Sequence, residues 1–345
     1  MRENISQRGQ LRHIPALDGF RAIAILLVLG YHAGLPGMDG GYFGVDLFFV
    51  LSGFLISTIL LNEAQATGTI SLSRFYMRRI RRLTPALVIL LLGYIALAPF
   101  AWPQASLGHH IREVAYTATY LSDYMRAFTG VPALLGHTWS LAVEEHFYML
   151  WPFALMALLR RFPLEKLPRV LAALFIIATL WRIGCFVAGQ EWEEVYFRFD
   201  TRLSGLLLGA WLASLALIGK IPSYGKFSLA GSAGFFLFTV IFAAWGTAES
   251  LTACVVFAEL FAVVLIAHLA AHERSVASRL LSLPVFVFIG RISYGLYLYH
   301  SPILYYLSTN YGVGVAVAIG VPVSIALAAA SYYLIEKRFL ASPKA

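Results

Sequence analysis

Apolar runs about as long as a membrane-spanning helix recur along the whole chain, and short polar or basic stretches separate them. A helix needs about 20 mostly apolar residues to cross the hydrocarbon core of a bilayer. By this length, the pattern predicts about ten spanning helices, at residues 17–35, 42–61, 83–102, 138–159, 170–188, 201–217, 227–245, 251–271, 285–307 and 313–335. We therefore expect an all-α fold, a polytopic transmembrane helix bundle. The sequence has no internal repeat and no low-complexity tract, so residues 1–345 are interpreted as a single integral membrane domain.

The composition agrees with this pattern. Of the residues, 59% are hydrophobic and 13% are charged, and the mean hydropathy is +0.74. A soluble domain carries about 25% charged residues, so lipid is the expected solvent for most of this chain. The first apolar run contains Asp18, Arg21 and His32, which the core of a cleavable signal peptide would exclude. It is interpreted as a retained first helix.

Basic residues lie in alternate connections between the predicted helices, as the positive-inside rule requires. The N-terminus carries Arg2, Arg8 and Arg12, and the tail carries Lys344. The predicted loop after the second helix carries the densest cluster: Arg74, Arg78, Arg79, Arg81 and Arg82. With an even number of helices, both termini are expected in the cytoplasm. The same distribution explains the net charge of +8 without a nucleic-acid partner.

Ionisable side chains inside spanning helices are costly, and they are candidates for function. Arg21 and His32 face nearly the same way on the first helix, about 16 Å apart along its axis, and Asp18 lies close to that face. Two interpretations are open. In the first, Asp18 and Arg21 form a structural ion pair, and His32 is simply a histidine at the membrane interface. In the second, His32 is a general base for a hydroxyl nucleophile.

The second helix places Asp46 at a depth similar to that of His32, because only a short glycine-rich connection joins the two helices. A carboxylate beside a histidine fixes its tautomer. The glycines are also explained if they only allow the helices to pack closely. Ser52, further along the helix, is more typical of a serine bonded to its own backbone than of a nucleophile.

Two later helices carry polar stripes. Ser140, Glu144 and Tyr148 share one face of the fourth helix. On the ninth helix, Ser293, Tyr297 and His300 share a face, which an aromatic packing stripe would also explain. Two weaker candidates, Asp200 and Arg202, lie at the start of the sixth helix and pair with each other or bind substrate.

The arginine cluster exceeds what orientation requires, and guanidinium groups suit phosphates. Anionic lipid headgroups and the phosphates of a cytoplasmic cofactor are both open as its ligands. No metal is expected, because His268 and His272 have no carboxylate in a recognisable motif beside them. Cys185 and Cys254 lie in apolar runs and are interpreted as buried hydrophobic residues.

Several of these segments resemble motifs of the acyltransferase-3 family of membrane O-acyltransferases. The family hallmark, an arginine or lysine followed after ten residues by a histidine, is met by Arg21 and His32. Four further segments are similar to family signatures in the same order: residues 41–54, 75–85, 139–148, which include Trp139, and 293–300. Many family members carry an appended hydrolase-like domain. This chain ends soon after Phe339 and resembles the standalone type.

The resemblance implies transfer of acetyl or another short acyl group from an acyl-CoA to a hydroxyl of a carbohydrate, in the bacterial cytoplasmic (inner) membrane. We expect His32 to act as general base, oriented by Asp46 or Glu144. Arg78, Arg79, Arg81 and Arg82 are expected to hold donor phosphates, with Arg21 positioned by Asp18. The other expected substrate or donor contacts are Ser52, Trp139, Ser140, Tyr148, Asp200, Arg202, Tyr297 and His300. A proton-coupled transporter of a small solute is the alternative.

Overall fold

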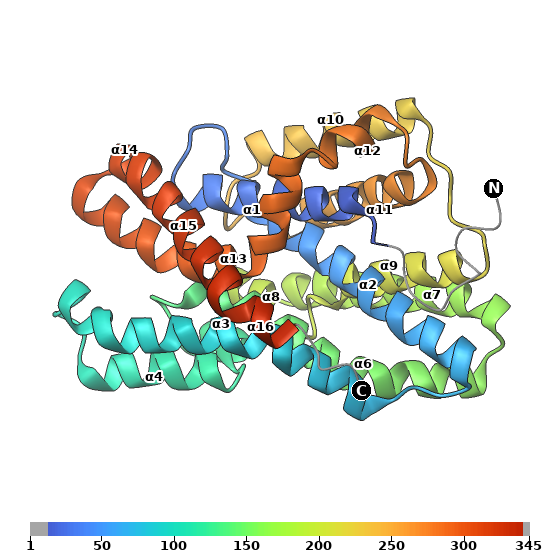
Figure 1. Ribbon diagram of the computed structural model, residues 1–345, viewed down its shortest axis with the longest axis horizontal. Helices are drawn as coiled ribbons and strands as arrows, with labels where there is room; N and C mark the ends of the chain where they lie inside the picture. The colour runs from blue at the N-terminus through green and yellow to red at the C-terminus, as the bar shows by residue number, and fades with distance from the viewer. Residues whose placement is uncertain (1–12, 341–345) are drawn as a thin grey trace.

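The computed structural model describes residues 13–340, and every regular element within that range is helical (Figure 1). The basic residues Arg2, Arg8, Arg12 and Lys344 lie outside the described residues. The α-helices are α1 (Pro15–His32), α2 (Gly44–Thr67), α3 (Leu72–Ala101), α4 (Leu107–Ala118), α5 (Ser122–Thr129), α6 (Trp139–Arg161), α7 (Leu167–Val187), α8 (Trp192–Phe197), α9 (Leu203–Leu217), α10 (Lys226–Phe242), α11 (Val255–Ala271), α12 (Val276–Leu281), α13 (Pro284–Tyr311), α14 (Val313–Val315), α15 (Val321–Ser331) and α16 (Lys337–Leu340). The shorter elements are three 3₁₀ turns, η1 (Gly41–Phe43), η2 (Gly136–Thr138) and η3 (Leu164–Lys166), and three π-helical turns, η4 (Ser250–Cys254), η5 (Ala316–Gly320) and η6 (Tyr332–Glu336).

Each segment predicted to span the membrane coincides with a helix or an unbroken helical run. Within residues 13–340, six of these are long and apolar enough to cross a bilayer: Pro15–His32, Gly41–Thr67, Leu72–Ala101, Leu164–Val187, Ser250–Ala271 and Val313–Leu340. The helices α9 and α10 are apolar but shorter. Polar side chains lower the mean hydropathy of α6 and α13. The chain is an integral membrane protein.

The prediction of a loop that carries the arginine cluster after the second helix is wrong. The arginine cluster lies inside α3, which begins at Leu72 and continues without a break into the apolar span. Arginine is a good helix former, and no glycine or proline interrupts the first three turns of this helix. The basic side chains therefore have fixed directions on a helix surface.

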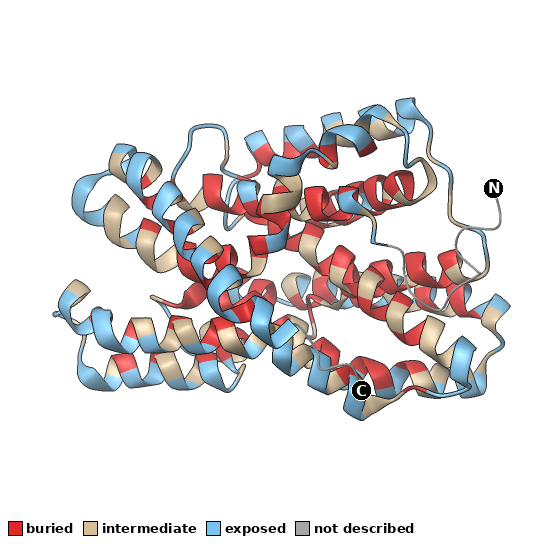
Figure 2. Ribbon diagram, viewed as in Figure 1, coloured by how far each residue is buried: buried red, intermediate tan, exposed pale blue. Residues whose placement is uncertain are grey.

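Four helices, α1, α2, α9 and α11, form the buried centre of the molecule, and α3, α10, α14 and α15 are more exposed (Figure 2). Two pairs of helices run side by side, α2 with α9 and α1 with α13. Glycines allow the first pair to approach closely. A Cβ atom added to Gly53 would lie 2.0 Å from the backbone oxygen of Leu206, and one added to Gly209 would lie 2.0 Å from that of Val50. This packing fixes the rotation of α2, and hence the direction of its polar side chains.

Candidate active site

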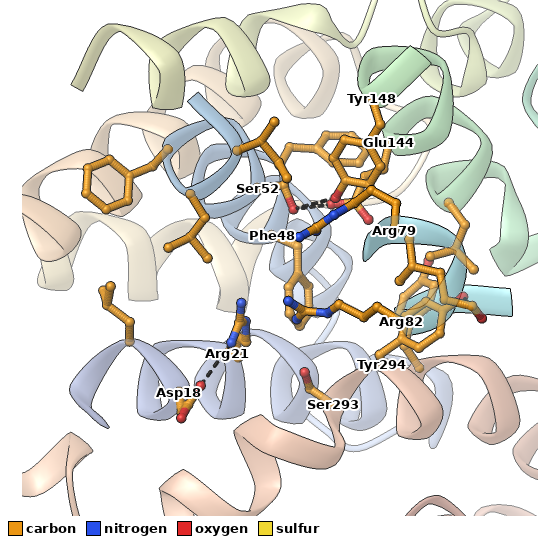
Figure 3. A pocket seen from close by; sticks show the side chains of 18 of the residues that line it. Asp18, Arg21, Phe48, Ser52, Arg79, Arg82, Glu144, Tyr148, Ser293 and Tyr294 are labelled. Atoms are coloured by element: carbon orange, nitrogen blue, oxygen red, sulfur yellow. Dashed lines mark hydrogen bonds and ion pairs between the residues drawn. The ribbon is translucent and has the colours of Figure 1, made fainter. Parts of the chain in front are cut away.

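A cavity of about 360 Å³ lies between the first half of α1, the middle of α2, the start of α3, and parts of α6 and α13 (Figure 3). Its polar lining residues include ten that were singled out in the sequence: Asp18, Arg21, Ser52, Arg79, Arg82, Ser140, Glu144, Tyr148, Ser293 and Tyr297. Five separate segments of the chain thus bring their polar faces together in one space.

One wall of the cavity is strongly cationic. Arg21 is half-buried and donates a hydrogen bond of 2.9 Å to Asp18, whose other carboxylate oxygen lies 2.7 Å from Nε2 of His13. The guanidinium groups of Arg79 and Arg82 point into the same space (Figure 3). Within residues 13–340, neither has a carboxylate at ion-pair distance. Among the described residues, neither arginine forms an ion pair, although the carboxylate of Glu144 lines the same cavity.

Packing holds Arg79 in place. Its guanidinium carbon lies 5.9 Å from the ring centre of Phe75 and 5.8 Å from that of Tyr148, so the ring faces support the cation. Two other arginines of the cluster, Arg78 and Arg81, are exposed and do not line the cavity. The side chain of Arg78 lies 3.8 Å from Glu63. Of the four arginines expected to bind phosphates, Arg79 and Arg82 line the cavity, and they share one face of α3.

A hydrogen-bonded polar group occupies another side of the cavity. The hydroxyl of Ser52 donates to the carboxylate of Glu144, and the hydroxyl of Tyr148 donates to Ser52 over 3.3 Å. Near the start of α6, the hydroxyl group of Ser140 lies 2.6 Å from that of Tyr297 on α13. Spacing on the fourth helix predicted the shared face, and the structure adds the partners on α2 and α13.

The histidine His32 lies outside this cavity, near the end of α1, in a cluster with His300 of α13 and His137 of η2. The ring centres of His32 and His300 are 4.9 Å apart, and those of His137 and His300 are 5.5 Å apart. Tyr297 connects the two regions, because it lines the cavity and its ring centre lies 5.5 Å from that of His300.

Hydrogen bonds assign the tautomers of two of these histidines. The Nδ1 atom of His32 lies 2.9 Å from the backbone oxygen of Val28, and Nδ1 of His300 lies 2.7 Å from that of Tyr297. A backbone oxygen only accepts, so in the neutral rings each Nδ1 carries the proton. His32 then presents Nε2 with a free lone pair, which is the form that a general base requires.

The expectation that Asp46 or Glu144 orients His32 is not met by the hydrogen bonds in residues 13–340. Oδ1 of Asp46 lies 2.6 Å from Nη2 of Arg202, and both side chains are 1% exposed. Glu144 bonds to Ser52 instead. The close packing of α2 against α9 explains the first result, because it turns Asp46 toward the start of α9.

Two buried charges were missed in the sequence. Arg182 of α7 donates a hydrogen bond of 2.6 Å to Ser204, which in turn donates one of 2.5 Å to Glu259 of α11. Nη1 of Arg182 lies 3.7 Å from Glu259 itself. Each is a lone charge inside an apolar run, and the rule that singled out Asp18 would have found both. With Asp46 and Arg202 they make two neutral pairs in the centre of the bundle.

The remaining candidates lie outside the cavity. Trp139 is buried, and its ring centre lies 5.5 Å from the guanidinium of Arg202. Asp200 pairs with Arg198 at 2.6 Å rather than with Arg202. Burial opposes the charged form of Asp200, but hydrogen bonds from Arg198 and Trp181 outweigh it and lower the pKa of this carboxyl. Trp139 and Asp200 thus support other side chains.

Comparison with known proteins identifies the family. A family model described as "Acyltransferase domain" matches residues 14–333. The peptidoglycan O-acetyltransferase OatA of Listeria monocytogenes is 32% identical over 315 residues, covering 86% of this chain and 50% of that protein. The O-acetyltransferase OatA of Staphylococcus aureus is 34% identical over 320 residues, covering 87% and 52%. The chain spans about half the length of these relatives, and no solved structure matches it. The chain belongs to the acyltransferase-3 family.

Proposed function

We propose that this chain is a membrane O-acyltransferase that moves acetyl or another short acyl group from acyl-CoA to a hydroxyl of a carbohydrate. One observation carries the proposal. A cavity with the guanidinium groups of Arg21, Arg79 and Arg82 lies beside the first half of α1, and a histidine with a free Nε2 lies at the other end of the same helix.

The cationic cavity suits the phosphates of a CoA donor. Guanidinium groups donate several hydrogen bonds in a plane that matches phosphate oxygens. Arg79 and Arg82 are the proposed phosphate ligands, with Arg21 deeper along α1 and held by Asp18. Under the positive-inside rule this end of the bundle faces the cytoplasm, where acyl-CoA is made, and both termini lie there. The proposed location is the bacterial cytoplasmic membrane.

The chemistry proposed at His32 is proton abstraction from the acceptor. Nε2 takes the hydroxyl proton, the oxygen attacks the thioester carbonyl carbon, the carbon–sulfur bond breaks, and the CoA thiolate leaves and recovers the proton. The thioester reaches His32 past Tyr297, which borders both regions. The same bonds form and break overall if Nε2 attacks the thioester first, which gives an acyl-histidine intermediate that the acceptor hydroxyl then attacks.

The proposed acceptor is a cell-surface glycan. One relative is named a peptidoglycan O-acetyltransferase and another an O-acetyltransferase. The first name describes acetyl transfer to an oxygen of a glycan polymer, which supports a sugar hydroxyl as the acceptor. Because the relatives extend over about twice this length, the acceptor is a proposal for this chain.

The test is acyl transfer by the purified protein in detergent. Acetyl-CoA labelled in the acetyl group is incubated with a panel of glycans, and labelled product is separated from donor. We expect transfer by the wild type and its loss in His32→Ala. Equal transfer by both proteins would overturn the role of His32. No transfer to any glycan, together with solute uptake by vesicles lacking acyl-CoA, would overturn the acyltransferase proposal.

A further inference from the structure

Aromatic side chains gather at the end of α1 opposite the cavity, around His32. The ring of Tyr31 lies edge-on to His32, with ring centres 5.1 Å apart. Trp245, in the connection after α10, stacks on Tyr31 with ring centres 6.1 Å apart and planes 27° from parallel. We call these two rings the aromatic platform. Trp245 is 37% exposed and Tyr31 is partly exposed, so both rings are reachable from outside.

The platform is held rigidly from behind. The ring of Trp245 lies 4.4 Å from that of Trp192 and 4.7 Å from that of Tyr196, centre to centre. Nε1 of Trp192 donates a hydrogen bond of 2.9 Å to the backbone oxygen of Thr247, which fixes the connection that carries Trp245. A preorganised aromatic face loses little side-chain entropy when a ligand covers it.

One positively charged side chain lies near the platform. Arg126 of α5 lies over the ring of Phe197 at 4.8 Å and donates a hydrogen bond of 2.6 Å to the backbone oxygen of Pro132. Burial lowers the pKa of Arg126, and the charges of Glu193 and Glu113 act against this shift. The ring centre of Phe197 lies 6.1 Å from that of Trp245, so the guanidinium of Arg126 is one ring away from the platform.

This combination fits a sugar ring. A pyranose has an apolar face of C–H groups that covers an aromatic ring, and hydroxyl groups at its edge that need polar partners. Binding sites for small ligands combine such apolar surfaces with a few placed polar groups. A tryptophan that only anchors a protein in the membrane interface needs no histidine beside its stacking partner.

We propose that Tyr31 and Trp245 form a sugar-binding subsite that holds a ring of the acceptor glycan beside His32. This inference rests on the proposed function, because it places the acceptor at the histidine that would activate it. The subsite lies at the far end of α1 from the cationic cavity, so donor and acceptor approach His32 from opposite directions.

The test measures glycan binding and kinetics separately. The probe is the β-1,4-linked tetrasaccharide of N-acetylglucosamine. Its binding without donor is followed by saturation-transfer NMR, and the KM values for tetrasaccharide and acetyl-CoA are measured in detergent. Trp245→Leu keeps apolar bulk but removes the aromatic face, and Trp245→Phe keeps a smaller one. The matched control is Phe242→Leu, which changes a 68% exposed aromatic residue three positions earlier.

We expect Trp245→Leu to raise the tetrasaccharide KM about tenfold, since an aromatic contact contributes up to about 1.5 kcal/mol and 1.4 kcal/mol is tenfold. The KM for acetyl-CoA stays unchanged, Trp245→Phe is intermediate, and Phe242→Leu behaves as wild type. If Trp245→Leu does not fold, Trp245→Phe carries the test with a smaller rise.

The possible results show which of the two proposals, the sugar-binding subsite or the acyltransferase function, is wrong. Transfer with an unchanged tetrasaccharide KM in both Trp245 variants overturns the subsite and leaves the acyltransferase proposal standing. Tetrasaccharide binding that depends on Trp245, without acetyl transfer, supports the subsite and overturns the acyltransferase proposal. No tetrasaccharide binding by the wild type overturns the subsite. Lower stability in vesicles with unchanged binding also overturns it and makes Trp245 a membrane anchor.

Discussion

The Nε2 atom of His300 lies 3.4 Å from the Nδ1 atom of His32. The proton of His300 is on its Nδ1, which donates to backbone oxygens of α13, so its Nε2 is an acceptor. The N–H of His32 therefore has two acceptors, the backbone oxygen of Val28 and the ring of His300. His300 therefore lies beside the N–H of His32, where a carboxylate was expected from the sequence.

Replacing these two histidines should have unequal effects. We expect His32→Ala to lower kcat by about 10²- to 10⁴-fold, the usual contribution of a general base. His300→Ala should lower kcat less, by up to about tenfold, which corresponds to one hydrogen bond of about 1.4 kcal/mol, because Val28 still holds the N–H of His32. The KM values for donor and acceptor should change little in both. Steady-state kinetics with labelled acetyl-CoA measure each constant.

Two further variants separate positioning by His300 from a role in folding alone. The side-chain oxygen of glutamine accepts a hydrogen bond, so His300→Gln should recover part of the lost kcat. His272→Ala removes a histidine that stacks on His268 and should leave kcat unchanged. Equal kcat in wild type and His300→Ala would show that the backbone bond alone orients His32.

Two double variants of the arginines of α3 can be compared, because each removes the same amount of positive charge. Arg79→Ala with Arg82→Ala removes both cavity arginines, and Arg78→Ala with Arg81→Ala removes two exposed ones. Hydrogen bonds to charged groups contribute about 1.5–3 kcal/mol each, so the first pair should raise the KM for acetyl-CoA about a hundredfold.

Thermal stabilisation by CoA checks the same assignment without catalysis. A ligand that binds only the folded state raises the melting temperature. CoA should stabilise the wild type and the Arg78 and Arg81 double variant, and should fail to stabilise the Arg79 and Arg82 double variant. If both double variants respond alike, the cluster acts through its overall charge, for example on lipid headgroups, and the phosphate site is refuted.

The helices could be predicted because the bilayer requires long apolar runs, and every predicted run is helical. The shared face of Ser140, Glu144 and Tyr148 could also be predicted, because spacing within one helix fixes relative directions. The extra turns of α3 were missed because a basic amphipathic stretch resembles a loop when only hydropathy is followed.

The rotation of one helix against another could not be predicted from spacing. Asp46 was expected beside His32, and it faces Arg202 because the glycine contacts between α2 and α9 set the rotation of α2. The position of His300 beside His32 depends in the same way on the packing of α13 along α1. Contacts between distant segments carry no periodic signal in one sequence.

The buried pair of Asp46 and Arg202 predicts a loss of stability. Asp46→Asn leaves the Arg202 guanidinium buried without its counter-ion, which costs about 3–5 kcal/mol. The matched control is Arg74→Gln, which removes a 63% exposed arginine from its pair with Glu63 and should cost about 0.2–1 kcal/mol. Chemical denaturation in detergent gives both values.

A double variant tests whether the loss comes from the unpaired charge. Asp46→Asn with Arg202→Gln removes both charges and should regain much of the stability lost in Asp46→Asn alone. If Asp46→Asn instead keeps wild-type stability and loses acyl transfer, then Asp46 acts in catalysis, and its structural assignment is wrong.

The contact between α2 and α9 gives the last prediction. Gly53→Ala would place a Cβ atom 2.0 Å from the backbone oxygen of Leu206, so the two helices must separate. Overpacking of this kind costs about 1–3 kcal/mol or more. Gly93→Ala in α3 meets no atom within 4 Å and should stabilise the protein by about 0.5–1 kcal/mol, the helix preference for alanine. Denaturation of both variants in detergent should therefore give changes of opposite sign. Because α2 also carries Ser52 and Phe48 into the cavity, Gly53→Ala should weaken CoA binding as well, and unchanged stability and binding would show that α2 and α9 are further apart than this packing requires.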